Sequence, residues 1–255
     1  MKLTLLLALQ LLACLFSISA VTYGDVVADL KGDWSDTSNP NVTANGTWTY
    51  RQGTSALPLV NDWTWLGGSL PQPAWAPSNS AGNFLPAIFR STTVNFDWQI
   101  GDIIIHSNDA SNGNASAYAN VTWTSSLNAV VNIDGNAWMG RDAGRGNNWT
   151  LLLNGSQLSS GHVESGDPYS RSNPFSFQNG SGGSAALSNV SIVAGDVIEL
   201  RVEKTTTLGD FVGVNLSISS VPEPSGFLIL TIATVGGSLC TRQRKRTPNP
   251  KSTKR

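Results

Sequence analysis

The chain of 255 residues contains many short runs in which apolar and polar residues alternate, and no stretch shows helical periodicity over three turns. The clearest alternation lies between residues 212 and 218, where Val, Val, Leu and Ile occupy every second position. A period of two is the pattern of a half-buried β-strand. Alternation or short apolar runs predict further strands at 47–50, 84–90, 103–106, 120–124, 129–134, 149–154, 174–178, 187–193 and 198–202.

Turn-forming dipeptides lie between or beside these runs: Asn45-Gly46, Asp134-Gly135, Asn154-Gly155, Asn179-Gly180 and Gly195-Asp196. Asn-Gly and Asp-Gly pairs suit tight turns because both positions tolerate positive φ. About ten short strands without helices predict an all-β fold, specifically a jelly-roll-like β-sandwich over residues 25–219. A closed barrel is the alternative.

The first 24 residues are typical of a secretory signal peptide. Met1-Lys2 precedes an apolar run from Leu3 to Ile18, and small residues follow. We expect a signal helix here and cleavage between Ser19 and Asp25. Cys14 ends a loose lipobox, so a lipoprotein anchor is the alternative, although the apolar run continues past it.

Residues 220–255 have three parts. Val221, Pro222, Glu223 and Pro224 come first, an uncharged and largely apolar stretch follows at 226–240, and Arg242, Arg244, Lys245 and Arg246 form a basic cluster. The prolines keep the first part extended and outside any sheet ladder. As a transmembrane helix the apolar stretch would reach only about 22 Å, against a hydrocarbon core of about 30 Å. Such a weak span fits a transient sorting signal.

This arrangement resembles the PEP-CTERM sorting signal, and the resemblance extends from Val221 to Arg246. It implies recognition by a membrane enzyme of the exosortase type, with cleavage near Pro-Glu-Pro, in a bacterium that makes extracellular polysaccharide. The preceding domain also resembles a β-rich domain of such sorted proteins, through generic hairpin motifs such as Gly46-Thr47-Trp48-Thr49-Tyr50. The alternative is an ordinary single-pass anchor.

Charge is distributed unevenly along the chain. Residues 25–220 contain 16 Asp and Glu but 8 Lys and Arg, whereas residues 241–255 contain seven basic residues and no acidic ones. An acidic domain repels phosphate backbones, so we do not expect nucleic acid as a partner. Basic residues after an apolar stretch stay cytoplasmic, which predicts a membrane-associated tail with the domain outside the cell.

The two cysteines, Cys14 and Cys240, both lie outside the predicted domain. The domain therefore has no disulfide, no cysteine-ligated metal and no cysteine nucleophile. A domain of this size buries enough apolar surface to fold without such constraints.

Catalytic motifs are missing from the sequence, which contains no Gly-x-Ser-x-Gly, no His-Glu-x-x-His and no phosphate-binding loop. We interpret His106 and His162 as strand-end and surface residues, since sequence cannot place a nucleophile beside either. Paired carboxylates would support a polysaccharide hydrolase or lyase, which is the alternative function. Glu199 is expected to face solvent. We therefore predict that the protein is not an enzyme.

No cofactor is predicted. A structural calcium ion is the alternative, because Asp134, Asp142 and Asn147 supply oxygen donors within one Gly-rich region.

Nine tryptophans are present. Three of them, Trp63, Trp65 and Trp75, fall in a Gly- and Pro-rich stretch that we interpret as a loop packing its rings onto the sandwich. The alternative is that these rings are exposed and stack on sugars.

The predicted function is therefore an exported cell-surface or extracellular-matrix protein, with weak polysaccharide binding as its candidate activity.

Overall fold

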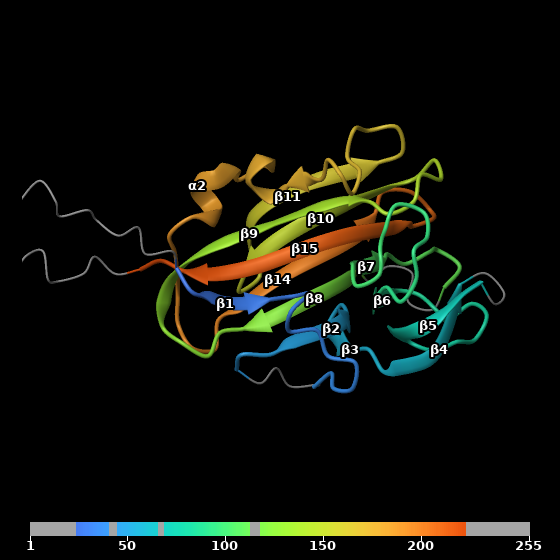
Figure 1. Ribbon diagram of the computed structural model, residues 1–255, viewed down its shortest axis with the longest axis horizontal. Coiled ribbons are helices and arrows are strands. Elements are labelled where there is room, and N and C mark those ends of the chain that lie inside the picture. The colour runs from blue at the N-terminus through green and yellow to red at the C-terminus, as the bar shows by residue number, and fades with distance from the viewer. Residues whose placement is uncertain (1–23, 41–44, 66–68, 113–117, 223–255) are drawn as a thin grey trace, which may run out of the picture. The chain divides into compact units, whose positions relative to one another are not determined.

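The computed structural model describes residues 24–40, 45–65, 69–112 and 118–222. These residues form an all-β fold with two antiparallel sheets, as predicted (Figure 1). The expected signal helix and the apolar segment 226–240 lie outside the described residues. Within the described ranges, no helix is both long enough and apolar enough to cross a membrane.

The larger sheet has nine strands, and seven of them follow the order β12-β9-β15-β7-β6-β5-β4. β1 pairs with β15 and β13 pairs with β9 outside this path. The bounds are β1 (Val26–Asp29), β4 (Leu59–Trp65), β5 (Ser69–Trp75), β6 (Ala87–Arg90), β7 (Ile103–His106), β9 (Ala129–Met139), β12 (Phe175–Ser176), β13 (Val190–Ile192) and β15 (Phe211–Ser220).

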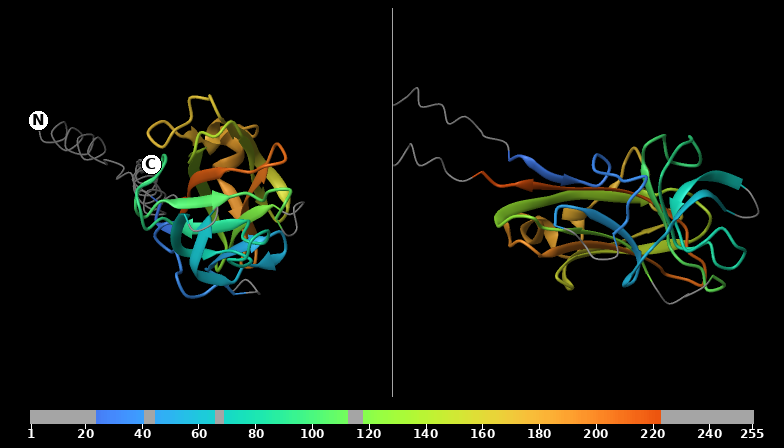
Figure 2. Two further views of the ribbon diagram at one scale, coloured as in Figure 1. Left: turned by 90° about the vertical axis from the view of Figure 1, so that its right-hand side faces the viewer. Right: turned by 90° about the horizontal axis from the view of Figure 1, so that it is seen from below.

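The smaller sheet has six strands in the order β11-β10-β14-β8-β2-β3. Its strands are β2 (Trp48–Gln52), β3 (Ser55–Ala56), β8 (Ala119–Thr124), β10 (Gly146–Leu153), β11 (Ser156–Glu164) and β14 (Val197–Lys204). The two sheets lie one over the other (Figure 2).

Two short helices interrupt a region that we had predicted to be strand and turn. The 3-10 helix η1 (Phe177–Asn179) follows β12, and the helix α2 (Gly183–Leu187) precedes β13. The strands predicted at 174–178 and 187–193 are therefore shorter than expected. Leu187 and Phe177 are buried in the core, so both helices are held by the burial of one apolar residue each rather than by helical periodicity.

Two of the predicted turns have different outcomes. Asn154 and Gly155 have φ of 50° and 79° and join β10 to β11, so this hairpin turn is confirmed. Asp134-Gly135 instead lies inside β9, where Gly135 pairs with Leu216 of β15. A Cβ at Gly135 would overlap the Asn215 carbonyl oxygen and lie 2.8 Å from the ring of Phe177, so this glycine allows close packing inside the sheet and does not form a turn.

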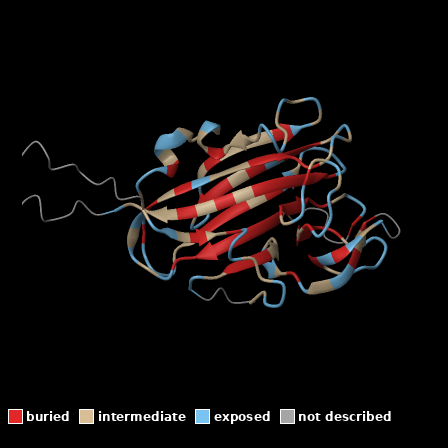
Figure 3. Cartoon of the chain, viewed as in Figure 1, coloured by how far each residue is buried: buried red, intermediate tan, exposed pale blue. Residues whose placement is uncertain are grey.

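The main hydrophobic core lies between the two sheets. Trp123 and Leu200 of the smaller sheet belong to the same buried cluster as Ile105, Ile133 and Val214 of the larger sheet. Burial is concentrated along the middle of the strands, while the connecting loops are exposed (Figure 3). Each such side chain contributes roughly 1.5–3 kcal/mol through removal of apolar surface from water.

A second core covers the other face of the larger sheet at one end. Ile103 and Ile105 point into the main core, whereas Ile104 between them belongs to the second cluster. The largest members of this second cluster are Trp63, Trp65, Phe89, Trp98, Trp138 and Phe211. One end of this sheet is therefore buried on both faces, and its strands read as continuous apolar runs.

The stretch around Trp63, Trp65 and Trp75, expected to be a loop, is the β4–β5 hairpin. The prolines at 71 and 73 argued against a strand, because proline has no amide hydrogen for a ladder. β5 pairs with β6 only through Trp75 and Ile88, so neither proline occupies a register position opposite β6.

Candidate functional site

The described part of the predicted sorting motif lies directly after the last strand. Val221 donates its amide hydrogen to the Val130 carbonyl at 2.8 Å, and the next residue, Pro222, is exposed. Proline cannot continue the ladder, because it has no amide hydrogen. Glu223, Pro224 and the basic cluster Arg242, Arg244, Lys245 and Arg246 lie outside the described residues.

All three tryptophans considered for sugar stacking are buried. Trp63, Trp65 and Trp75 are 0%, 7% and 3% exposed. Trp63 donates its indole N–H to the Phe84 carbonyl at 2.8 Å, and Trp65 packs edge-on against Phe211. In this arrangement the three rings offer no free face to a sugar.

Trp34 is the one tryptophan of the nine that is not buried. It lies in the polar segment between β1 and β2, and its ring packs on Tyr50 with 4.4 Å between the ring centroids. Tyr50 in turn stacks on Trp75 at 5.4 Å, with the two rings nearly parallel. The partly buried ring of Trp34 is therefore held in place by its packing on Tyr50, which in turn stacks on Trp75.

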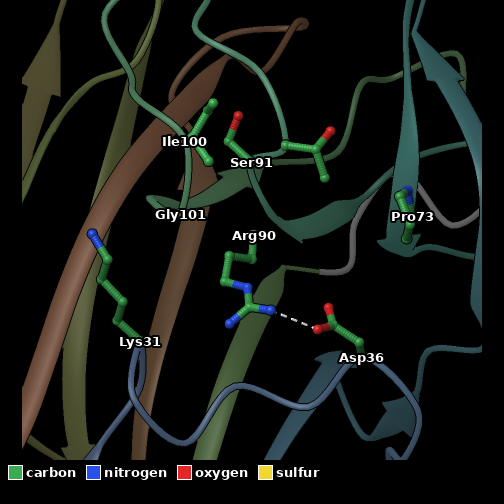
Figure 4. A pocket seen from close by; sticks show the side chains of 8 residues that line it. Lys31, Asp36, Pro73, Arg90, Ser91, Ile100 and Gly101 are labelled. Atoms are coloured by element: carbon green, nitrogen blue, oxygen red, sulfur yellow. Dashed lines mark hydrogen bonds and ion pairs between the residues drawn. The ribbon is translucent and has the colours of Figure 1, made fainter.

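Asp36, the hydrogen-bond partner of the Trp34 indole, lines a pocket of about 580 Å³, which we call the Arg90 pocket (Figure 4). Its walls come from the segment after β1, from β5, from the end of β6 and from the β6–β7 loop. The lining residues are Lys31, Asp36, Pro73, Arg90, Ser91, Thr92, Ile100 and Gly101. A volume of this size falls within the range of small-ligand sites, roughly 300–1,000 Å³.

An ion pair crosses the pocket. The guanidinium of Arg90 contacts the Asp36 carboxylate at 2.6 Å, and the other oxygen of Asp36 accepts the indole N–H of Trp34 at 2.7 Å. Burial raises the pKa of Tyr50, below Trp34, well above its usual range, although a hydrogen bond from the Ser35 amide acts in the opposite direction. Tyr50 is therefore a neutral phenol at physiological pH.

A second charged group supports the pocket from behind. Lys31 contacts Asp102 at 3.1 Å, and Arg171 contacts the same carboxylate at 2.5 Å. Burial acts to raise the pKa of Asp102, but hydrogen bonds from Arg171, the Gln99 amide and Lys31 outweigh it, so the pKa is lowered. Asp102 is thus an ionised carboxylate shared by two cations.

His106 lies in a different, buried polar cluster at the end of β7. Its side chain is fully buried, and its Nδ1 lies 2.6 Å from the Ser107 carbonyl, to which it can only donate a hydrogen. Burial lowers the pKa of His106 to about 4, so the ring is neutral at pH 7. Within the described ranges, its Nε2 has no hydrogen-bond partner.

Asp210 contributes a carboxylate to the same cluster. One of its oxygens accepts the Phe211 amide at 2.9 Å, and burial raises the pKa of Asp210 to about 6. The hydroxyl of Ser107 donates to Asn147 instead of to the imidazole. A Ser–His–Asp relay would need a serine hydroxyl donating to the histidine, and Ser107 does not supply one.

The remaining candidates have structural partners. His162, on β11, lies at the surface within 3.1 Å of Glu164. The prediction that Glu199 faces solvent was wrong, since the residue is only 8% exposed. Neighbouring side chains on the same sheet face cover it, and two of them, Arg201 and Asn120, donate hydrogen bonds to its carboxylate.

The three residues considered for calcium do not share one set of partners. Asp134 accepts a hydrogen bond from Gln178, Asp142 accepts one from Ser165, and Asn147 accepts one from Ser107. Among the described residues, no three His, Cys, Asp or Glu side chains gather in a way that could hold a metal ion.

Lys31, Trp34 and Arg90 were not among the residues predicted to form a site. A tryptophan placed among Gly, Asp and Ser in Lys31–Asp36, with no apolar neighbour, was the available signal for an incompletely buried ring. No family model matches the chain, and no curated protein matches it either.

Proposed function

We propose that this protein is an exported cell-surface or extracellular-matrix component that binds polysaccharide through the Arg90 pocket and acts without catalysis. The single observation that carries the binding proposal is the hydrogen bond from the indole of the partly buried Trp34 to Asp36, a residue that lines the pocket. Aromatic faces next to hydrogen-bonding groups are suited to the apolar faces and hydroxyls of sugars.

The sorting part of the proposal rests on the sequence of the two ends. The signal peptide would export the domain, and the PEP-CTERM-like tail would bring it to an exosortase-type enzyme in the membrane. The exposure of Pro222 directly after the last strand supports access of a processing enzyme to this segment. Among the described residues, the last strand ends at Ser220, and Val221 donates the last backbone hydrogen bond to the larger sheet.

We further propose that the sandwich is of the jelly-roll type. Consecutive strands from β7 to β10 alternate between the two sheets, and β14 and β15 do the same. Such repeated crossing from one sheet to the other is the connectivity that Greek-key sandwiches use.

Binding is tested with the detergent-solubilised full-length chain and a panel of soluble polysaccharides, by affinity electrophoresis and calorimetry. Trp34→Ala should weaken binding roughly tenfold, because stacking on one aromatic ring contributes on the order of 1–3 kcal/mol in other ligands with flat faces. Trp34→Phe keeps a ring and should retain most of the affinity. If no polysaccharide binds the unmodified protein, the binding proposal is wrong.

Sorting is tested in a host with an exosortase-type enzyme. Replacing Pro222, Glu223 and Pro224 with alanine should leave the domain folded and keep it in the membrane fraction. Mass spectrometry of the unmodified surface protein should find that the C-terminal residues, including Arg255, have been removed. Retention of that end on most molecules would show that the tail is a plain anchor.

A further inference from the structure

We infer that the Arg90 pocket selects acidic polysaccharides, in which a sugar carboxylate binds between Lys31 and Arg90. This inference rests on the proposed function and adds the chemical class of the ligand. Three features of the pocket support it: an excess of positive charge, an ion pair that a ligand can replace, and apolar walls beside the charges.

The first feature is the charge balance. The charged residues that line the pocket are Lys31, Arg90 and Asp36, so the lining carries one net positive charge. The described domain as a whole has twice as many acidic as basic residues. A polyanion is therefore repelled by most of the surface and attracted to this group, which favours binding in one place.

The second feature is the difference between the two carboxylates. Asp102 is held firmly, since its side chain is 3% exposed and Arg171 donates to both of its oxygens at 2.5 and 3.3 Å. Arg90 and Asp36 are open to solvent, with side chains 39% and 53% exposed. An exposed ion pair of this kind contributes little to stability, so a ligand carboxylate can take the place of Asp36 at small cost.

Asp36 keeps a partner when it is displaced from Arg90, because it also accepts the indole N–H of Trp34 at 2.7 Å. The ammonium of Lys31 has three donor hydrogens, and the structure gives it one contact, to Asp102. Lys31 can thus donate to a ligand carboxylate without leaving Asp102. The planar guanidinium of Arg90 can receive the same carboxylate in a two-point contact.

The third feature is the apolar surface of the pocket. Ile100 is 66% exposed and lies on the opposite side of Arg90 from Asp36, while Pro73 lies on the Asp36 side (Figure 4). A sugar ring has apolar C–H faces as well as polar groups, whereas an inorganic anion has no apolar surface and acidic peptide side chains have no rigid apolar face. The combination of two cations with the apolar side chains of Ile100 and Pro73 therefore favours a carboxylated sugar.

The test compares two ligands with the same backbone, using the full-length chain in detergent. A hexamer of galacturonic acid and its fully methyl-esterified form share one sugar backbone, but the ester carries a neutral methyl ester in place of each charged carboxylate. We expect the acid form to bind at least tenfold more tightly in 50 mM salt, and the difference to shrink in 500 mM salt, where exposed charges are screened.

The double variant Lys31→Gln with Arg90→Gln should lose the preference for the acid form while its unfolding curve stays close to that of the unmodified protein. Lys204→Gln removes one positive charge from β14, in the smaller sheet, and should keep the preference. Equal binding of the acid and ester forms would overturn the inference and leave the proposed function intact. If the protein binds neither form and no other polysaccharide, both the inference and the proposed function are wrong. If polyglutamate binds as tightly as the acid form, the specificity for sugars is wrong.

Discussion

The guanidinium of Arg171 donates two hydrogen bonds to the carboxylate of Asp102, 69 residues earlier in the chain, at 2.5 and 3.3 Å. This contact joins the segment after β11 to the residue that immediately precedes β7. It also fixes the carboxylate that Lys31 shares at the back of the Arg90 pocket. Removing the contact between Arg171 and Asp102 should therefore lower the stability of the protein and loosen the position of Lys31 in the pocket.

Arg171→Gln should lower the free energy of unfolding at pH 7 by about 1–2 kcal/mol. Hydrogen bonds to charged groups contribute about 1.5–3 kcal/mol, and the partial exposure of Arg171 reduces that contribution. Urea unfolding followed by tryptophan fluorescence measures the change, with Lys204→Gln as the charge-matched control. A variant as stable as the control would contradict the role of this contact.

The effect of Arg171→Gln should also depend on pH. The pKa of Asp102 is lowered from its ordinary 3.8 in the folded protein, so the stabilisation is complete above that value and is lost as pH falls through the folded pKa. The difference between the variant and the unmodified protein should therefore be constant from pH 7 to pH 5 and should narrow below pH 4. A constant difference down to pH 3 would show that charge on Asp102 is not involved.

Asp210→Asn should stabilise the protein at neutral pH. Burial raises the pKa of Asp210 to about 6, so the folded state binds more protons than the unfolded state between that value and its ordinary 3.8. Stability from this group therefore rises as pH falls from 7 to 4. The variant removes that slope, and its advantage of up to about 2 kcal/mol at pH 7 should vanish near pH 4. Thermal unfolding across pH 4–7 measures it, and a loss of stability at pH 7 would contradict it.

The titration of His106 should make the stability of the protein depend on pH in the opposite direction to that of Asp210. Burial lowers its pKa from 6.5 to about 4, so the folded state binds fewer protons in that interval and this contribution to stability falls as pH falls. The slope should be visible in Asp210→Asn, where the opposing group is absent. NMR titration of the His106 ring signals should give a midpoint near pH 4, and a midpoint at or above 6.5 would show that the ring is accessible to water.

Gly213→Ala should be strongly destabilising. A Cβ at this position in β15 would overlap the ring of Trp138, which lies directly over the glycine in the second core. Overpacking of this kind costs typically about 1–3 kcal/mol, because the ring has no room to move. Ser217→Ala, on the half-buried part of the same strand, is the control and should change stability by less than about 0.5 kcal/mol. Equal unfolding curves for both variants would contradict the packing of Trp138 on Gly213.

The local sequence pattern was enough to predict the fold class and many of the strand positions. The alternation at 212–218 and 149–154 corresponds to β15 and β10, because a half-buried strand places apolar residues at every second position. The short apolar run at 103–106 corresponds to β7, which is buried on both faces. The Asn154-Gly155 turn was predictable for an equally local reason, since both residues adopt positive φ.

Other features depended on contacts between distant segments. The sequence Ile103-Ile104-Ile105 does not reveal that its middle residue serves a second core, which exists only because the β4–β5 hairpin and the β6–β7 loop cover the outer face of the sheet. Prolines made that hairpin look like a loop. Asp134-Gly135 looked like a turn, although the glycine is needed where the ring of Phe177 approaches β9.

The sequence by itself therefore determined an all-β domain, a core without thiols and the two unusual ends that motivate export and sorting. Only the tertiary structure decided that Trp34, rather than Trp63, Trp65 or Trp75, is incompletely buried, and that Lys31 and Arg90 line one pocket. The physical reason is that alternation along a strand sets which face a side chain occupies, whereas burial and shared charge depend on what other segments bring to that face.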